Sequence, residues 1–281
     1  MPAKKSVFLL NQAKKHKLSI VLSVLLVVLS LQLKPALAQQ TQTPVEKAKS
    51  DYNFQIAKYN DSHESYITAK ESYLSFKTAV AKTNAFTQTK TYLGQTGQLY
   101  LSFFSLLQEH VNSIKWTNLS SFNQDASNIL NEESAYFREF NQRVESTKTL
   151  EELPPLADEL QAHIRNDTEP KMNKVLAILE IGQTDASLSE FNTLSNILDR
   201  IVLFKLRSGE AQSVLANWSS EIKSIRDITQ SNIDKAKEEI AARPQTTYTK
   251  GDLDRVTDQT TAAKEELKRS EPLLREAARI I

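Results

Sequence analysis

The sequence predicts an all-α protein, an elongated helical bundle or coiled coil of about six helices that follows an N-terminal signal segment. Glycine is scarce, with five copies in 281 residues. A β-sandwich or α/β fold of this length needs many tight turns, and therefore many more turns rich in Gly, Asn and Asp. Apolar residues instead recur at alternating spacings of three and four positions, the pattern of helices that bury one face.

A targeting segment occupies the N-terminus. Residues 1–45 hold six Lys and no acidic residue. A basic stretch at 14–17 precedes an uncharged run over 18–33, and the small residues Ala36 and Ala38 follow. This order of a basic region, an apolar region and a small-residue site is typical of a secretory signal peptide.

The length of the apolar run favours cleavage over anchoring. Its 16 residues rise about 24 Å as a helix, which is short of the roughly 20 residues that span a bilayer comfortably. We therefore expect a signal peptide over 1–38, cleaved after Ala38, and an extracytoplasmic α-helical domain over 39–281. Retention of the segment as an uncleaved anchor is the alternative.

The charge of the expected mature domain argues against nucleic acid as a partner. Removal of 1–38 takes away six of 35 basic residues and none of 34 acidic ones, so 29 basic residues face 34 acidic ones and the net charge is −5. Phosphate binding needs a concentrated basic surface, and the remaining Lys and Arg are mixed with Asp and Glu. Since the chain has no Cys, packing alone must hold the domain together.

Helix boundaries are marked by capping patterns. Thr43 and Glu46 form a capping box around Pro44, a favourable first helical residue. Similar boxes occupy 149–152, 187–190 and 249–252. We expect helices at 44–84, 88–115, 119–147, 150–181, 187–241 and 250–280, with kinks or short breaks at Pro170 and Gly209.

Two glycines lie close together in the second of these segments. Because Gly94 and Gly97 would each cost about 1 kcal/mol relative to Ala inside a helix, we expect the helix to start after them. The alternative is that a neighbouring backbone approaches closely at this point.

The third segment shows the apolar rhythm with one exception. Glu133 is the one charged residue at a position where this spacing predicts a buried apolar side chain. The full series of predicted core positions is Leu119, Phe122, Ala126, Ile129, Glu133, Tyr136, Phe140 and Val144. In the fifth segment Trp218, Ile222 and Ile225 occupy successive seam positions. Truncation of a buried Trp218 to Ala is expected to cost about 3–5 kcal/mol.

A tyrosine stripe runs along the first helix. Tyr52, Tyr59, Tyr66 and Tyr73 follow one another at seven-residue spacing, and the series extends to Val45 and Val80. An ideal helix drifts about 20° per heptad, so the four rings lie on one face. We expect them to pack against a neighbouring helix with their hydroxyls at the polar edge. The functional alternative is an exposed interaction stripe for a partner helix or a glycan.

The first two helical segments resemble exported helical proteins of unknown function from small-genome bacteria. The resemblance covers about the first half of the expected mature chain and rests on the phrases Asp-Tyr-x-Phe-Gln and Ala-Lys-x-x-Tyr-Leu. It implies a bacterial, exported, helical protein. It contains no catalytic motif and implies no activity or site residues.

The familiar chemical motifs of helical proteins are missing. A di-iron bundle needs Glu-x-x-His pairs, but the residues three before His63, His110 and His163 are not acidic. His163 lies four residues after Glu159, a spacing that predicts a surface pair or a hydrogen bond along one helix face. The chain has no Gly-x-Ser-x-Gly and no His-Glu-x-x-His. We expect no catalytic, cofactor-binding or metal-binding residues.

The remaining function classes are both non-enzymatic. The preferred one is an exported helical scaffold or interaction protein of the cell envelope, which binds a protein partner or itself through helix faces. Membrane contact is expected only through the signal segment, if it is uncleaved. The alternative is an extracytoplasmic, sensor-like helical bundle that binds a ligand.

Overall fold

The computed structural model describes residues 42–207 and 212–280 and is all-α within them. No β-strand occurs in these ranges, so the predicted fold class is confirmed. The signal segment expected at 1–38, with its cleavage residues Ala36 and Ala38, lies outside the described residues.

The first described helix, α2 (Pro44–Phe76), starts as predicted and ends early. At its start the Glu46 backbone N–H donates to Thr43 Oγ1 at 3.2 Å, and the Thr43 N–H donates to Glu46 Oε2 at 2.9 Å. The predicted end at 84 is wrong. Lys77 adopts a left-handed conformation with φ 50°, and the side chain of Thr78 accepts the Ala81 N–H at 3.2 Å to cap the next helix.

Helix α3 (Ala79–Ser113) runs without interruption through both glycines, so the expected helix start after them is wrong. A Cβ on Gly94 would meet nothing within 4 Å, whereas one on Gly97 would lie 2.0 Å from Asn141 Oδ1. The expected alternative of a close neighbour therefore applies to Gly97. The neighbour is a side chain of α4 (Ser120–Ser146) and not a backbone.

The segment predicted as one helix at 150–181 consists of three short helical parts followed by a long α-helix. The three parts are a 3₁₀ turn at Leu150–Glu152, α5 at Leu153–His163 and a π-helical turn at Ile164–Thr168. Helix α6 (Glu169–Arg207) follows. The irregularity expected at Pro170 is confirmed as the π-helical turn just before it. Proline lacks an N–H and its ring crowds the carbonyl four residues back, which disturbs the preceding turn.

The helix boundary expected between 181 and 187 is wrong, because α6 continues through it. The Ser187 hydroxyl donates to the Gln183 carbonyl at 3.0 Å in place of capping a new helix. The predicted helix at 187–241 is two helices, since α6 ends at Arg207 and α7 (Gln212–Ala241) begins beyond Gly209. Gly209 itself lies outside the described residues.

The last helix agrees with its predicted bounds and cap. A 3₁₀ turn at Gln245–Thr247 leads into α8 (Lys250–Ile280). The Thr249 N–H donates to Asp252 Oδ2 at 2.7 Å, and the Asp252 N–H donates to Thr249 Oγ1 at 3.3 Å. These reciprocal bonds form the predicted capping box.

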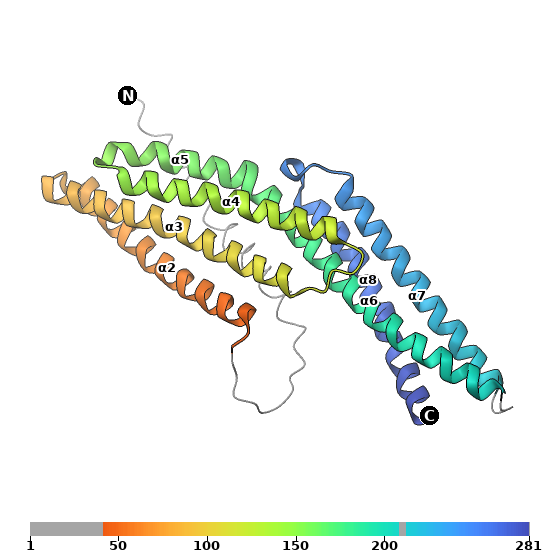
Figure 1. Cartoon of the computed structure of the whole chain (residues 1–281). Coiled ribbons are helices and arrows are strands. Elements are labelled where there is room, and N and C mark those ends of the chain that lie inside the picture. The colour runs from red at the N-terminus through yellow and green to blue at the C-terminus, as the bar shows by residue number, and fades with distance from the viewer. Residues whose placement is uncertain (1–41, 208–211, 281) are drawn as a thin grey trace. The chain divides into compact units, whose positions relative to one another are not determined.

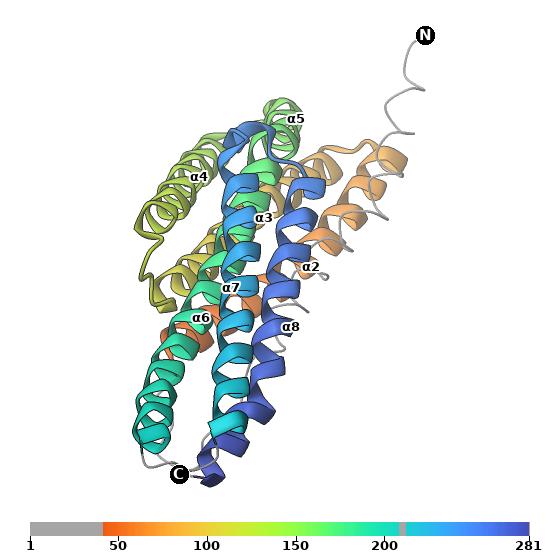
Figure 2. The ribbon, with the colours of Figure 1, turned by 90° about the vertical axis from the view of Figure 1, so that its right-hand side faces the viewer.

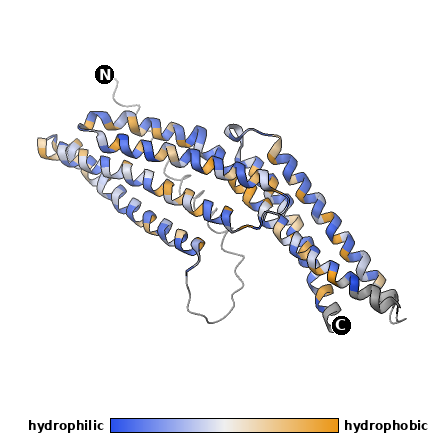
Figure 3. Ribbon diagram, in the orientation of Figure 1, coloured by the Kyte–Doolittle hydropathy of each residue, from blue (hydrophilic) through white to orange (hydrophobic). Residues whose placement is uncertain are grey.

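The helices pack in two connected groups (Figures 1 and 2). Helix α2 packs on α3, α3 packs on α4, and α4 contacts α6, while α6, α7 and α8 pack together. Apolar and polar residues are interleaved along every helix (Figure 3), as expected when each buries one stripe. Trp218, Ile222 and Ile225 are all buried, which confirms the seam predicted in α7.

Candidate interaction surface

The tyrosine stripe of α2 faces α3. Tyr52 is 2% exposed, and its ring centroid lies 5.6 Å from that of Phe103. Burial raises the pKa of Tyr52 to about 12. Tyr59 and Tyr66 are partly buried on the same face, and so is Tyr73 in the last turn of the helix.

One α3 residue, Tyr92, joins the middle of the stripe to its neighbour helix. Its ring stacks on Tyr66 with centroids 5.0 Å apart, and its hydroxyl lies 3.1 Å from that of Tyr59. His63 contributes a fourth ring, 5.2 Å from Tyr92. Burial, with Tyr59 nearby, raises the pKa of Tyr92 above its usual range. The rings of this part of the stripe are thus packed between α2 and α3 while keeping some exposure.

The end of the α2–α3 hairpin carries large apolar side chains in solvent. We call this surface the hairpin tip and define it as Leu74, Phe76, Lys77 and Val80. The side chains of Leu74, Phe76 and Val80 are 60%, 72% and 80% exposed. The seven-residue series placed Val80 on the packed face, which is wrong because α2 ends at Phe76 and the chain reverses there.

The backbone of the hairpin tip is tight. A residue other than glycine with φ near 50° is uncommon, and helices more often place Gly at such a position. Lys77 nevertheless holds this conformation, and its N–H donates to the Tyr73 carbonyl at 3.0 Å. Two residues, Lys77 and Thr78, therefore suffice to connect the two helices and to hold the apolar side chains at the turn.

The first turns of α3 are fastened to the neighbouring α4–α5 connection. Lys82 forms an ion pair with Glu151 at 2.6 Å. The Lys90 ammonium donates to the Glu145 carbonyl at 2.5 Å and to the Thr147 carbonyl at 3.0 Å. A cation there satisfies the free carbonyls at the C-terminal end of α4. The base of the hairpin tip is thus tied to a second pair of helices.

A buried polar network lies elsewhere, where α4 meets the π-helical turn. The Glu133 carboxylate, 1% exposed, accepts three hydrogen bonds: from His163 Nε2 at 3.1 Å, Thr168 Oγ1 at 2.7 Å and Lys171 Nζ at 2.8 Å. Burial alone raises the pKa of Glu133, but these three bonds outweigh it and lower the pKa to about 2. Glu133, the charged residue among the predicted core positions of α4, is therefore a buried carboxylate with three hydrogen-bond donors.

His163 differs from its predicted pairing. Its ring stacks on Tyr136 with centroids 3.4 Å apart, and Nδ1 lies 3.6 Å from Asp167 Oδ2. Glu159, four residues earlier, pairs instead with Arg143, whose Nη1 lies 2.6 Å from Glu159 Oε1. The bonds from His163 to Glu133 and from Arg143 to Glu159 join different helices, whereas the contact of His163 with Asp167 runs along one helical segment. The Glu133 network joins α4, α5, the π-helical turn and α6, and its carboxylate oxygens are occupied by donors from this chain.

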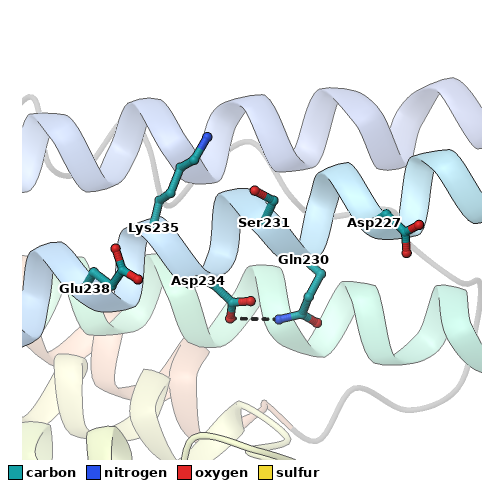
Figure 4. A pocket seen from close by; sticks show the side chains of 6 residues that line it. All are labelled: Asp227, Gln230, Ser231, Asp234, Lys235 and Glu238. Atoms are coloured by element: carbon teal, nitrogen blue, oxygen red, sulfur yellow. Dashed lines mark hydrogen bonds between the residues drawn. The ribbon is translucent and has the colours of Figure 1, made fainter.

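A shallow depression lies on α7 (Figure 4). Six side chains line it, all from the outward face of this one helix: Asp227, Gln230, Ser231, Asp234, Lys235 and Glu238. Gln230 Nε2 donates to Asp234 Oδ1 at 3.0 Å. The depression is a surface of one helix on which three carboxylates accompany one lysine.

Comparison with family models, curated proteins and solved structures gives no match for this chain. In residues 42–207 and 212–280, no helix combines the length and apolarity needed to cross a membrane. Within the same ranges, no three His, Cys, Asp or Glu side chains are grouped so as to hold a metal ion.

The seven-residue spacing predicts the tyrosine stripe, whereas two features of the structure, the hairpin tip and the Glu133 network, were not predicted. The hairpin tip could have been recognised from Thr78, a favourable N-cap residue. The polar network was signalled by Glu133 alone, because its partners lie 30 or more residues away along the chain.

Proposed function

We propose that this protein is a non-enzymatic helical scaffold, exported to the cell envelope, that docks through the hairpin tip. The observation that carries the proposal is the exposure of Leu74, Phe76 and Val80 together at one turn. A two-residue turn between helices needs no large apolar side chains of its own, and clustered exposed apolar residues are typical of interaction sites.

The packing behind the hairpin tip supports this proposal, because a docking element must keep its shape. The stacked rings of Tyr66 and Tyr92 fix α2 against α3, and Lys82 and Lys90 tie α3 to the end of α4. An interface presented on such packed helices loses little conformational entropy when it docks. The N-terminal sequence, with its basic and apolar regions, is the support for export.

The proposal is tested by the location of tip variants in the native cell. The double variant Phe76→Ser with Val80→Ser removes the two most exposed apolar side chains of the hairpin tip. We expect the wild-type chain to sediment with the envelope and this variant to move into the soluble fraction. The matched control is Phe54→Ser, since Phe54 is 56% exposed on α2 away from the turn. Equal distribution of all three chains would refute docking through the tip.

A second candidate function, ligand binding, is favoured by one observation. Tyr59, His63, Tyr66 and Tyr92 form a cluster of aromatic rings that keep partial exposure. Such rings offer stacking faces to a sugar. If a glycan binds here, a soluble oligosaccharide should slow the nitration of Tyr66 and leave that of Tyr73 unchanged. Unchanged nitration of both residues at saturating sugar would remove this candidate.

A further inference from the structure

We propose that the surface engaged by the hairpin tip is an anionic lipid bilayer, with Leu74, Phe76 and Val80 entering the interfacial layer and Lys77 contacting the head groups. This inference rests on the docking role proposed above and names the partner. It also departs from the sequence expectation, which assigned membrane contact to the signal segment alone.

The form of the hairpin tip suits a bilayer. Its apolar side chains project from the end of two helices joined by Lys77 and Thr78, and each is at least 60% exposed. A projecting apolar end can enter the boundary between head groups and acyl chains without any matching groove. Leu74 and Phe76 come from the last turn of α2 and Val80 from the first turn of α3, so a single surface can cover all three.

The charges around the hairpin tip fit an anionic surface. Residues 72–81 carry Lys77 as their single charge, and no acidic residue occurs in 72–108. Of the flanking carboxylates, Glu71 lies nearly two turns before Lys77, and Glu151 is paired with Lys82 at 2.6 Å. A cation among apolar residues is the combination that peripheral membrane segments use, because head groups attract the charge while the apolar groups enter the boundary.

A probe at the hairpin tip tests the inference in the full chain. Since the chain has no Cys, Val80→Cys gives a single attachment point for an environment-sensitive NBD fluorophore. Vesicles of phosphatidylcholine with 30% phosphatidylglycerol should shift its emission to the blue and raise its intensity. Vesicles of phosphatidylcholine alone should give a much smaller change. The same fluorophore on Phe54→Cys is the matched control and should not respond, even if the N-terminal segment binds the vesicle.

The charge requirement is tested separately. Lys77→Glu should weaken the partition into anionic vesicles about tenfold or more. Lys47→Glu, an exposed lysine at the opposite end of α2, should leave the partition nearly unchanged. Equal losses from the two variants would overturn the assignment of Lys77 to the head groups.

The outcomes separate the partner from the docking role. No response at position 80, or an equal response at position 54, would overturn the lipid assignment. If tip variants still leave the envelope fraction in cells while the vesicle probe is silent, the docking function stands and its partner is a protein groove. If tip variants remain in the envelope fraction, the docking function itself fails.

Discussion

The Glu133 carboxylate of α4 lies 2.8 Å from the Lys171 ammonium of α6. Glu133 is 1% exposed and the Lys171 side chain is 12% exposed, so the pair is nearly enclosed. Thr168 and His163 complete the bonding of the carboxylate. The connection matters for the fold because it joins the two groups of helices at the π-helical turn.

Loss of the Glu133 carboxylate is expected to destabilise the fold strongly. Glu133→Ala should lower the free energy of unfolding by about 3–5 kcal/mol, because it takes the nearest and most buried carboxylate away from the nearly buried Lys171. The neighbouring Glu132 lies 3.6 Å from Lys171 but is 57% exposed, so Glu132→Ala should cost less than about 1 kcal/mol. Urea unfolding of the two variants measures the difference. Similar midpoints for both would show that the network does not hold the helices together.

The same carboxylate gives stability a definite pH dependence. The Glu133 pKa is about 2 in the folded protein against an ordinary value of 4.5, so the unfolded chain takes up the proton first as the pH falls. The stabilisation is complete above about pH 5 and is lost between there and pH 2. This shift corresponds to roughly 3 kcal/mol.

The measurement compares the wild type with Glu133→Gln, which keeps the shape and removes the titration. Between pH 5 and pH 2 the free energy of unfolding of the wild type should fall more steeply than that of the variant. Parallel curves would contradict the assigned pKa.

Substitution of alanine for two helical glycines should change the free energy of unfolding in opposite directions. A Cβ at Gly182 of α6 would lie 2.5 Å from ring atoms of Trp116. That ring is held by a bond from Trp116 Nε1 to the Val111 carbonyl at 2.8 Å. Gly182→Ala should therefore destabilise by about 1–3 kcal/mol through overpacking.

The matched position is Gly94, where a Cβ would meet nothing within 4 Å. Gly94→Ala should raise the free energy of unfolding by up to about 1 kcal/mol through helix propensity alone. Thermal and urea unfolding of the two variants measure the direction of each change in stability. A stabilising Gly182→Ala would show that the ring of Trp116 does not occupy this space.

The tyrosine stripe is expected to stabilise the chain from within. Tyr59→Ser with Tyr66→Ser removes the contacts that these two rings make with Tyr92 and should cost about 2–3 kcal/mol, with the oligomer mass unchanged. Phe54→Ser, as an exposed control, should stay within about 0.5 kcal/mol. Unfolding combined with light scattering tests this. A change of mass without loss of stability would instead make the stripe an interface between molecules.

The sequence predicted the fold class and the buried faces because these follow from periodicity. Trp218 and Tyr52 are buried as their spacing indicated. Local capping chemistry was a reliable guide at Thr43 and Thr249, where both bonds of the box form. At Ser187 the same pattern occurs inside a helix, since tertiary packing on both sides keeps α6 continuous.

The sites were harder to predict because they depend on contacts between distant segments. The turn at Lys77 uses a left-handed lysine where a glycine is usual, so the local sequence offers Thr78, a favourable N-cap residue, as its signal and lacks the usual glycine. The three partners of Glu133 come from α5, the π-helical turn and α6. Spacing along α4 identifies Glu133 as unusual, but only the packing of the helices supplies its donors.

The central claim, docking through the hairpin tip, is tested most directly by thiol accessibility in place. Single variants Phe76→Cys and Phe54→Cys of the full chain are exposed to a membrane-impermeant maleimide, once as purified protein and once in the intact envelope. Both native side chains are well exposed, so both thiols should react readily in the purified protein. In the envelope the thiol at position 76 should react severalfold more slowly while the thiol at position 54 stays reactive. Equal reactivity at the two positions in the envelope would contradict the account.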